Sequence, residues 1–136
     1  MNGSFMYPDT IATLVNKHGI RLLLQFGSSV TGHLHQDSDI DLGVLLEAVP
    51  DSFAAEADLS TDLQSLVTDR NVDVTVINRA DPLLLQQIAA HHRLLYGTAR
   101  DLDAFRRYAF KRYQDHRPYL ALERHYVEDT LERITR

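Results

Sequence analysis

The feature that most constrains the fold is an apolar run, Ile20 to Phe26, that stops abruptly at Gly27-Ser28. A short apolar run bounded by a turn signal predicts a buried strand. Glycine permits a tight turn, and we expect a short helix from Ser28 to His33. After ten intervening residues the chain reads Asp39-Ile40-Asp41, inside a second predicted strand, Ser38 to Glu47. The stretch therefore combines a small-residue turn with two carboxylates on one strand.

The two carboxylates of the second predicted strand indicate a cation site. Residues i and i+2 of a strand point to the same face, so we expect Asp39 and Asp41 to project side by side. Two adjacent carboxylates repel each other, and a divalent cation offsets that repulsion. Mg²⁺ takes one or two carboxylates plus phosphate oxygens, and two metal ions about 4 Å apart can clamp a phosphoryl displacement. A solvated Asp-x-Asp is the alternative, which the nearby Gly-Ser turn makes less favoured.

Two further features extend this interpretation to phosphate chemistry. Gly27 lets the backbone approach a ligand, and Ser28 offers a hydroxyl beside N–H groups that can bind phosphate. Asp73 lies in Val-Asp-Val-Thr-Val-Ile, within a third predicted strand from Asn71 to Ile77. Burying a lone charge is costly. If this strand pairs with the second, Asp73 can complete a metal site and act as general base; the alternative is an edge-strand Asp that faces water.

The remaining pattern predicts a small α/β (α+β) protein with a mixed sheet of three to four strands and flanking helices. The other predicted elements are helices 9–17, 53–67 and 80–90, an edge strand 93–96, and a helical tail 101–136 that breaks or kinks at Arg117-Pro118. We expect one domain, 1–136, with a core of about 9–97 and C-terminal helices of about 99–136.

Charge and composition exclude some classes of function. The chain has 19 acidic and 14 basic residues and a net charge of −5, which does not favour direct binding of nucleic acid. Cysteine is absent, so disulfides and thiolate metal sites are excluded. We see no signal peptide and no apolar run of membrane-spanning length, and we expect a cytoplasmic protein.

The combined pattern of Gly-Ser, ten residues, Asp-x-Asp and a later strand Asp resembles the DNA polymerase β-like nucleotidyltransferase superfamily. The small size, the segment Val-Asp-Val-Thr-Val-Ile-Asn-Arg-Ala-Asp-Pro-Leu-Leu and the ending Leu-Leu-Tyr-Gly are similar to the minimal nucleotidyltransferase (MNT) group. The resemblance covers about Ile11 to Gly97 and extends more loosely over the tail.

This resemblance implies an antitoxin that is paired with a helical HEPN ribonuclease toxin in a hetero-oligomeric complex. Such a protein would transfer AMP from ATP to a tyrosine hydroxyl of the toxin. By position, Gly27 and Ser28 would hold the triphosphate, and Asp39 and Asp41 would bind two Mg²⁺ ions. Asp73 would complete the metal site and activate the hydroxyl.

Two alternatives stay open. An antitoxin could neutralise its toxin mainly by direct binding, although such a module has no need of three carboxylates together. A nucleotidyltransferase could instead modify a small-molecule hydroxyl, such as that of an aminoglycoside, although 136 residues leave little room for a second domain to hold that acceptor.

Several residues have no assigned role at this stage. His33 and His35 could contact phosphate, but exposed loop histidines are commoner. Arg70 and Arg79 could neutralise phosphate charge, but most arginines are surface residues. The run His91-His92-Arg93 predicts a polar turn with no metal-ligand partner nearby. The tail aromatics serve either core packing or partner docking: Phe105, Tyr108, Phe110, Tyr113, Tyr119 and Tyr126.

Overall fold

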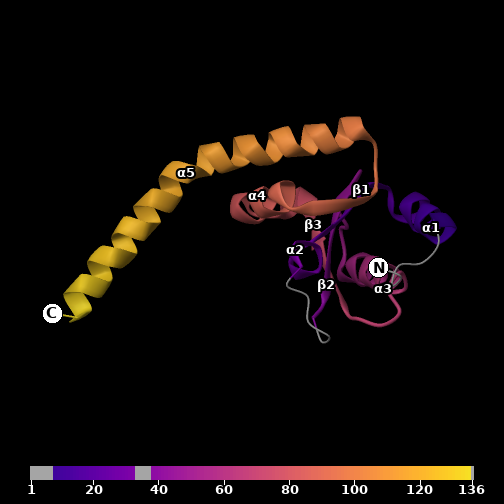
Figure 1. Cartoon of the computed structure of the whole chain (residues 1–136), viewed down its shortest axis with the longest axis horizontal. Coiled ribbons are helices and arrows are strands. Elements are labelled where there is room, and N and C mark those ends of the chain that lie inside the picture. The colour runs from indigo at the N-terminus through magenta and orange to yellow at the C-terminus, as the bar shows by residue number, and fades with distance from the viewer. Residues whose placement is uncertain (1–7, 33–37, 136) are drawn as a thin grey trace.

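The computed structural model describes residues 8–32 and 38–135, and its elements follow the predicted order (Figure 1). The strands are β1 (Ile20–Phe26), β2 (Ile40–Leu46), β3 (Val72–Val76) and β4 (His92–Tyr96). The helices are α1 (Pro8–His18), α2 (Ser28–Thr31), α3 (Phe53–Gln64), α4 (Pro82–Ala90) and α5 (Ala99–Thr135), and a 3-10 helix η1 spans Ile77–Arg79. The predicted mixture of a small sheet, flanking helices and a helical tail is confirmed.

The four strands form one mixed sheet in the order β3-β2-β1-β4. β1 is antiparallel to both β2 and β4, whereas β2 and β3 are parallel. The predicted edge strand is confirmed as β4. Because β1 runs against β2 and β3, the end of β1 and the beginnings of β2 and β3 meet at one edge of the sheet. The Gly27-Ser28 turn, Asp41 and Asp73 all lie at this edge.

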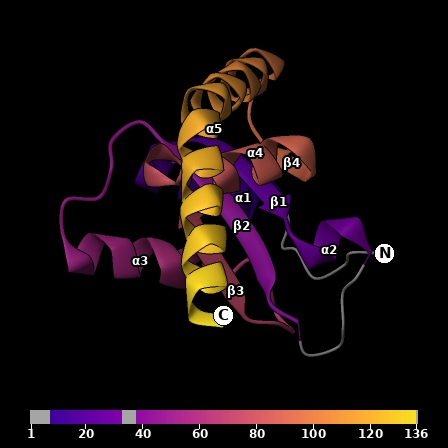
Figure 2. The same ribbon diagram turned by 90° about the vertical axis from the view of Figure 1, so that its left-hand side faces the viewer.

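Helices cover both faces of the sheet (Figure 2). On one face, strand side chains such as Leu23, Leu42 and Val44 pack with Leu14 and Val15 of α1 and with Leu59 and Leu63 of α3. On the other face, Leu22 and Leu24 of β1 pack with Leu85 and Ile88 of α4 and with Phe105 and Ala109 of α5. Successive residues of a strand point to opposite faces, so the apolar β1 contributes to both cores.

Local capping explains where three helices begin or end. Ser52 precedes α3 and its Oγ accepts a hydrogen bond from the Ala55 N–H at 3.1 Å. Asp81 precedes α4 and its Oδ1 accepts from the Leu84 N–H at 2.9 Å. α1 ends before Gly19, whose φ of +64° is a left-handed value that suits glycine. Each of these signals acts within about one helical turn of the helix end that it sets.

The end of α3 differs from the prediction of a helix over 53–67, because α3 stops at Gln64. The Gln64 side chain has another role there. Its Oε1 accepts from the Val72 N–H at 2.8 Å, and its Nε2 donates to the Arg70 carbonyl at 2.8 Å. The amide thus stabilises the turn that leads into β3, and the helix ends where this turn begins.

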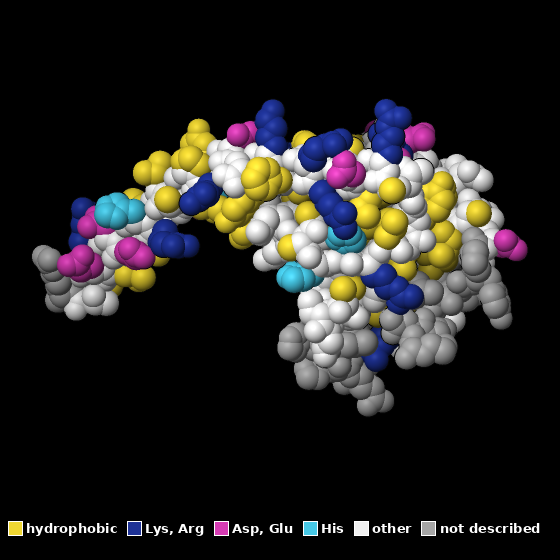
Figure 3. Space-filling model, turned by 45° about the horizontal axis from the view of Figure 1, so that its top comes forward, with side chains coloured by type: hydrophobic (Ala, Val, Ile, Leu, Met, Phe, Trp, Pro, Cys, Tyr) yellow, Lys and Arg dark blue, Asp and Glu magenta, His cyan; other side chains and the backbone are white. Residues whose placement is uncertain are grey.

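α5 continues through Pro118 and bends rather than breaks (Figure 1). Proline removes a backbone N–H and crowds the preceding turn, which kinks a helix. Phe105 and Ala109 are the buried residues of α5, and the later part extends away from the body of the protein (Figure 3). That part exposes large apolar side chains: Tyr119, Leu122, Tyr126, Val127, Leu131 and Ile134. Among the described helices, none combines the length and apolar character that a membrane crossing requires.

Candidate active site

A row of side chains across the sheet forms the floor of the candidate site. Phe26 on β1 is the register partner of Asp41 on β2, and Asp41 is the partner of Asp73 on β3. The condition set by the sequence, that the third strand pairs with the second, is therefore met. Asp73 stands beside Asp41, and its catalytic role stays a prediction.

The Gly27 turn lies directly against this row. Gly27 has φ +77° and ψ −156°, a backbone conformation that is essentially restricted to glycine. A Cβ at Gly27 would overlap the carboxylate of Asp41. The Gly27 carbonyl accepts hydrogen bonds from the N–H groups of Val30 at 3.0 Å and Thr31 at 3.2 Å, which start α2. The glycine therefore lets a backbone turn and a carboxylate occupy adjoining space.

The surroundings of Asp41 disfavour its negative charge. Burial raises the pKa of Asp41 above its ordinary value, and the charges of Asp73 and then Asp39 raise it further. Each cause disfavours the negative charge that a metal ligand carries. A divalent cation would reverse this balance, and a set of hard carboxylate oxygens suits Mg²⁺. The residues present therefore fit the metal that the sequence predicted.

Asp39 occupies a different position from the one predicted. We expected a strand from Ser38, but β2 begins at Ile40, whose N–H donates to the Asn71 carbonyl at 2.8 Å. Asp39 therefore precedes the strand and is exposed. It lines a separate hollow of about 490 Å³ with residues of the α3–β3 connection, including Arg70. Its charge still acts on Asp41.

A cleft of about 600 Å³ opens over the floor of the site. Its described lining comprises Phe26, Gly27, Ser28, Thr31, Asp41, Asp73, Thr75, Leu84, Gln87 and His91. The cleft thus unites four of the predicted site residues and leaves out Asp39.

One wall of the cleft was not predicted from the sequence. Leu84 and Gln87 are three residues apart and share one side of α4, and His91 follows at the C-terminal end of the helix. We predicted that His91-His92-Arg93 forms a polar turn with no metal-ligand partner nearby. The turn is wrong for His92 and Arg93, which begin β4. His91 follows the last residue of α4 and lines the same cleft as Asp41 and Asp73. The spacing was visible in the sequence, but the position of α4 over β1 was not.

The other candidate phosphate contacts lie elsewhere or are not described. Arg70 Nη1 donates to the Ser38 carbonyl at 3.2 Å. Arg79 Nη2 forms an ion pair with Glu56 Oε1 at 2.8 Å. Neither arginine lines the cleft. His33 and His35 fall outside the described residues, so their predicted phosphate contacts are not tested.

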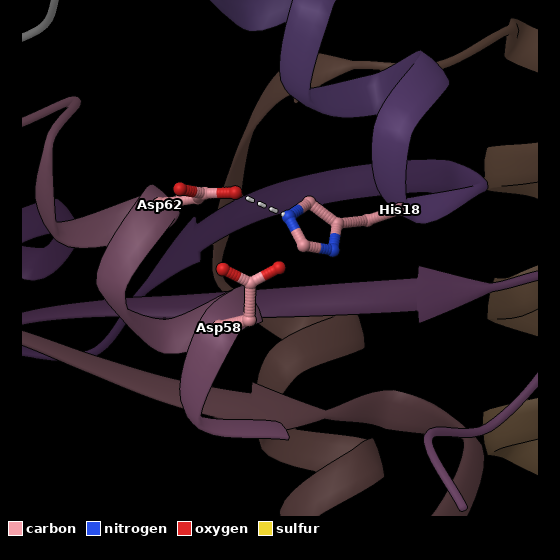
Figure 4. A group of neighbouring side chains, drawn as sticks. All are labelled: His18, Asp58 and Asp62. Atoms are coloured by element: carbon pink, nitrogen blue, oxygen red, sulfur yellow. Dashed lines mark hydrogen bonds and ion pairs between the residues drawn. The ribbon is translucent and has the colours of Figure 1, made fainter. Parts of the chain in front are cut away.

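A second group of ligand-type side chains, His18, Asp58 and Asp62, lies between α1 and α3 (Figure 4). One ligand atom from each lies within 4.8 Å of the others. The Nζ of Lys17 already sits 2.8 Å from Asp62 Oδ2 and 3.2 Å from Asp58 Oδ2.

The hydrogen bonds from Lys17 and His18 lower the pKa of Asp62. The seven residues of β1 separate His18 from Gly27 by about 23 Å at 3.3 Å per residue. We interpret the group as an ion-pair network that joins two helices, distant from the cleft.

Comparison with known proteins agrees with this geometry. Residues 9–101 match the family described as polymerase beta, nucleotidyltransferase. The protein adenylyltransferase MntA of Shewanella oneidensis is 32% identical over 110 residues, which cover 81% of this chain and 75% of the relative.

Two solved structures extend the comparison. A toxin–antitoxin crystal structure with AMP-PNP is 29% identical, with a TM-score of 0.71, over 93% of this chain and 99% of that chain. A tri-AMPylated Shewanella oneidensis HEPN toxin in complex with MNT antitoxin gives 27% identity and a TM-score of 0.65, over 91% of this chain and 94% of that chain. With two thirds of its length matched, and with the cleft in the place that the motif predicts, the chain belongs to the polymerase beta nucleotidyltransferase family.

Proposed function

We propose that this protein is a Mg²⁺-dependent enzyme that transfers AMP from ATP to a tyrosine hydroxyl of a HEPN-type toxin and thereby acts as its antitoxin. The observation that carries the proposal is the placement of Asp41 and Asp73 as register partners beside the glycine-only turn at Gly27. The similar proteins support the nucleotide and the acceptor, because they include a protein adenylyltransferase, an AMP-PNP complex and a tri-AMPylated HEPN toxin.

The carboxylates would hold the metal. Asp41 and Asp73, which are register partners, would each offer a carboxylate in the cleft, and Asp39 would offer a third from the segment that precedes β2. Two bound Mg²⁺ ions would neutralise phosphate charge and polarise the reacting phosphoryl group. Gly27 and Ser28 would bind the triphosphate through the backbone N–H groups of the turn and the serine hydroxyl.

The side chains have different roles in the in-line displacement. Asp73 stands on the β3 side of Asp41 and takes the proton of the attacking hydroxyl. The hydroxyl oxygen bonds to the α-phosphorus, and the bond between that phosphorus and the bridging oxygen breaks. Pyrophosphate leaves with the electron pair. The protein contributes positioning and charge stabilisation, as is usual in phosphoryl transfer.

The site of action follows from the proposed substrates. The chain would work in the cytoplasm, where ATP and Mg²⁺ are available and where a toxin and its antitoxin meet. We treat residues 1–136 as one catalytic domain in which α5 extends from the nucleotidyltransferase core.

Intact-mass measurement tests the proposal. The protein is incubated with ATP, Mg²⁺ and a candidate HEPN partner, and we expect the partner to gain one or more AMP groups. Asp41→Asn and Asp73→Asn should abolish the gain, while Asp58→Asn, in the distant ion-pair network, should leave it intact. A partner that is bound and inactivated while its mass stays unchanged would favour neutralisation by direct binding instead.

A further inference from the structure

The α4 wall of the cleft carries two polar side chains that the proposed reaction has not yet used. Gln87 shares one side of α4 with Leu84, and His91 follows directly after the helix; all three line the cleft. Both are exposed side chains that can donate hydrogen bonds. Both side chains can therefore contact a ligand that occupies the cleft.

Their position relative to the carboxylates is fixed by the sheet. His92, the next residue after His91, is the register partner of Phe26, which in turn pairs with Asp41. α4 itself packs through Leu85 and Ile88 on β1. His91 thus lies on the β1 side of Asp41, next to the Gly27 turn, whereas Asp73 lies on the β3 side.

In an in-line displacement, the attacking group and the leaving group occupy opposite sides of the site. The attacking oxygen and the leaving oxygen must stand on opposite sides of the phosphorus. If Asp73 receives the proton on the β3 side, the leaving group departs toward β1, where Gly27, Ser28 and His91 are found.

The charge of the cleft supports the same assignment. Among the described lining residues, His91 is the one side chain able to carry a positive charge, whereas Asp41 and Asp73 are both acidic. Arg70 and Arg79, which flank β3 in the sequence, do not line the cleft. Departing pyrophosphate carries the charge released by bond breaking, and a hydrogen-bond donor placed there stabilises the charge as it develops.

Neighbouring donors engage part of the carbonyl groups at the end of α4. The carbonyls at a helix C-terminus carry partial negative charge, which would repel phosphate. Here the Gln87 carbonyl accepts the His91 N–H at 3.1 Å, and the Ile88 carbonyl lies 2.9 Å from His92 Nδ1. Two of the last four carbonyls of α4 therefore have a donor nearby, and the side chains of Gln87 and His91 line the cleft.

We infer that His91, assisted by Gln87, binds the pyrophosphate leaving group through its imidazole N–H. This inference rests on the proposed function. In the step concerned, the electron pair of the broken P–O bond stays on the oxygen that had joined the α- and β-phosphorus. This oxygen becomes a terminal oxygen of pyrophosphate, and His91 donates a hydrogen bond to that product.

Binding of Mg²⁺-pyrophosphate, measured by titration calorimetry, tests the inference without requiring turnover. Loss of a hydrogen bond to a charged group should weaken pyrophosphate binding about tenfold to a hundredfold in His91→Ala. His91→Asn, which keeps an N–H donor, should recover part of the affinity, and Gln87→Ala should have a smaller effect. His125→Ala, on the exposed distal part of α5, is the matched control and should bind as the unchanged protein does. Binding of AMP should be the same in all of these proteins.

The outcomes separate this inference from the proposed function. Unchanged pyrophosphate binding by His91→Ala would overturn the inference even if AMP transfer to the partner occurs. Weakened AMP binding with normal pyrophosphate binding would also overturn it, because His91 would then contact the nucleoside part. Loss of pyrophosphate binding in His91→Ala, together with no AMP transfer by the unchanged protein, would support the inference and count against the proposed acceptor. Failure of the unchanged protein to bind pyrophosphate would overturn it outright.

Discussion

Replacing Gly27 by alanine should remove activity and stability through two separable effects. The backbone at φ +77° and ψ −156° is a region that other residues enter at a cost of about 1–3 kcal/mol. In addition, the new methyl group would overlap the Asp41 carboxylate. Since this carboxylate belongs to the proposed metal site, its displacement should reduce AMP transfer strongly.

Gly32→Ala provides the matched control. Gly32 also has a positive φ, +87°, but a Cβ there would meet no described atom within 4 Å. Its cost should therefore be the backbone strain alone, about 1–2 kcal/mol. For a domain of this size, 1 kcal/mol corresponds to a shift in Tm of roughly 4 °C. Gly32→Ala should lower the Tm by about this amount and leave Mg²⁺ binding unchanged. Gly27→Ala should lower the Tm and also weaken Mg²⁺ binding.

A double-mutant cycle isolates the contact. In an Asp41→Ala background the overlap is gone, so Gly27→Ala should cost less free energy of unfolding than it does alone. Urea denaturation of the four proteins measures the difference. Equal costs in both backgrounds, or full AMP transfer by Gly27→Ala, would refute the reasoning that this glycine exists to make room for Asp41.

Three further predictions follow from the described contacts. Asp41→Asn removes a half-buried charge that is repelled by its neighbours, so it should raise the Tm without metal and abolish the rise caused by Mg²⁺; equal responses to Mg²⁺ in a thermal melt would contradict this. The pKa of Asp62 is lowered by Lys17 and His18, so the stabilisation is present above the unfolded pKa of 3.8 and is lost as pH falls through the lower folded pKa. Lys17→Met should therefore be less stable than the unchanged protein in denaturation at pH 7 and equal to it in strong acid, and a deficit that persists in acid would point to packing of the lysine stem. Phe105→Ala should lower the free energy of unfolding by about 3–5 kcal/mol, whereas Tyr126→Ala, at a site 72% exposed, should change it by less than about 0.5 kcal/mol; similar losses would mean that the distal part of α5 packs against the core.

Features that depend on neighbours along the chain were predictable from the sequence. The capping residues Ser52 and Asp81 and the stop at Gly19 act within one helical turn, so their effect can be read locally. The apolar run of β1 required burial on both faces wherever it was placed. These elements were predicted correctly for that reason.

Features that depend on contacts between separate segments of the chain were not predictable from the sequence. β2 begins at Ile40 because its N–H meets the Asn71 carbonyl, a partner more than thirty residues away, so the strand start predicted at Ser38 was wrong. α3 ends at Gln64, whose side chain binds the backbone of Arg70 and Val72 in the turn before β3. These partners lie beyond the single helical turn that a local signal covers.

The candidate site divides in the same way. The sequence by itself determined the chemistry, since Gly27, Ser28 and the three aspartates can be recognised by residue type and spacing. Tertiary structure decided the geometry: the parallel pairing of β2 and β3 put Asp73 beside Asp41, and the packing of α4 on β1 brought His91 into the cleft. Spacing along a chain specifies which groups are available, whereas only strand pairing and helix packing specify which of them share one space.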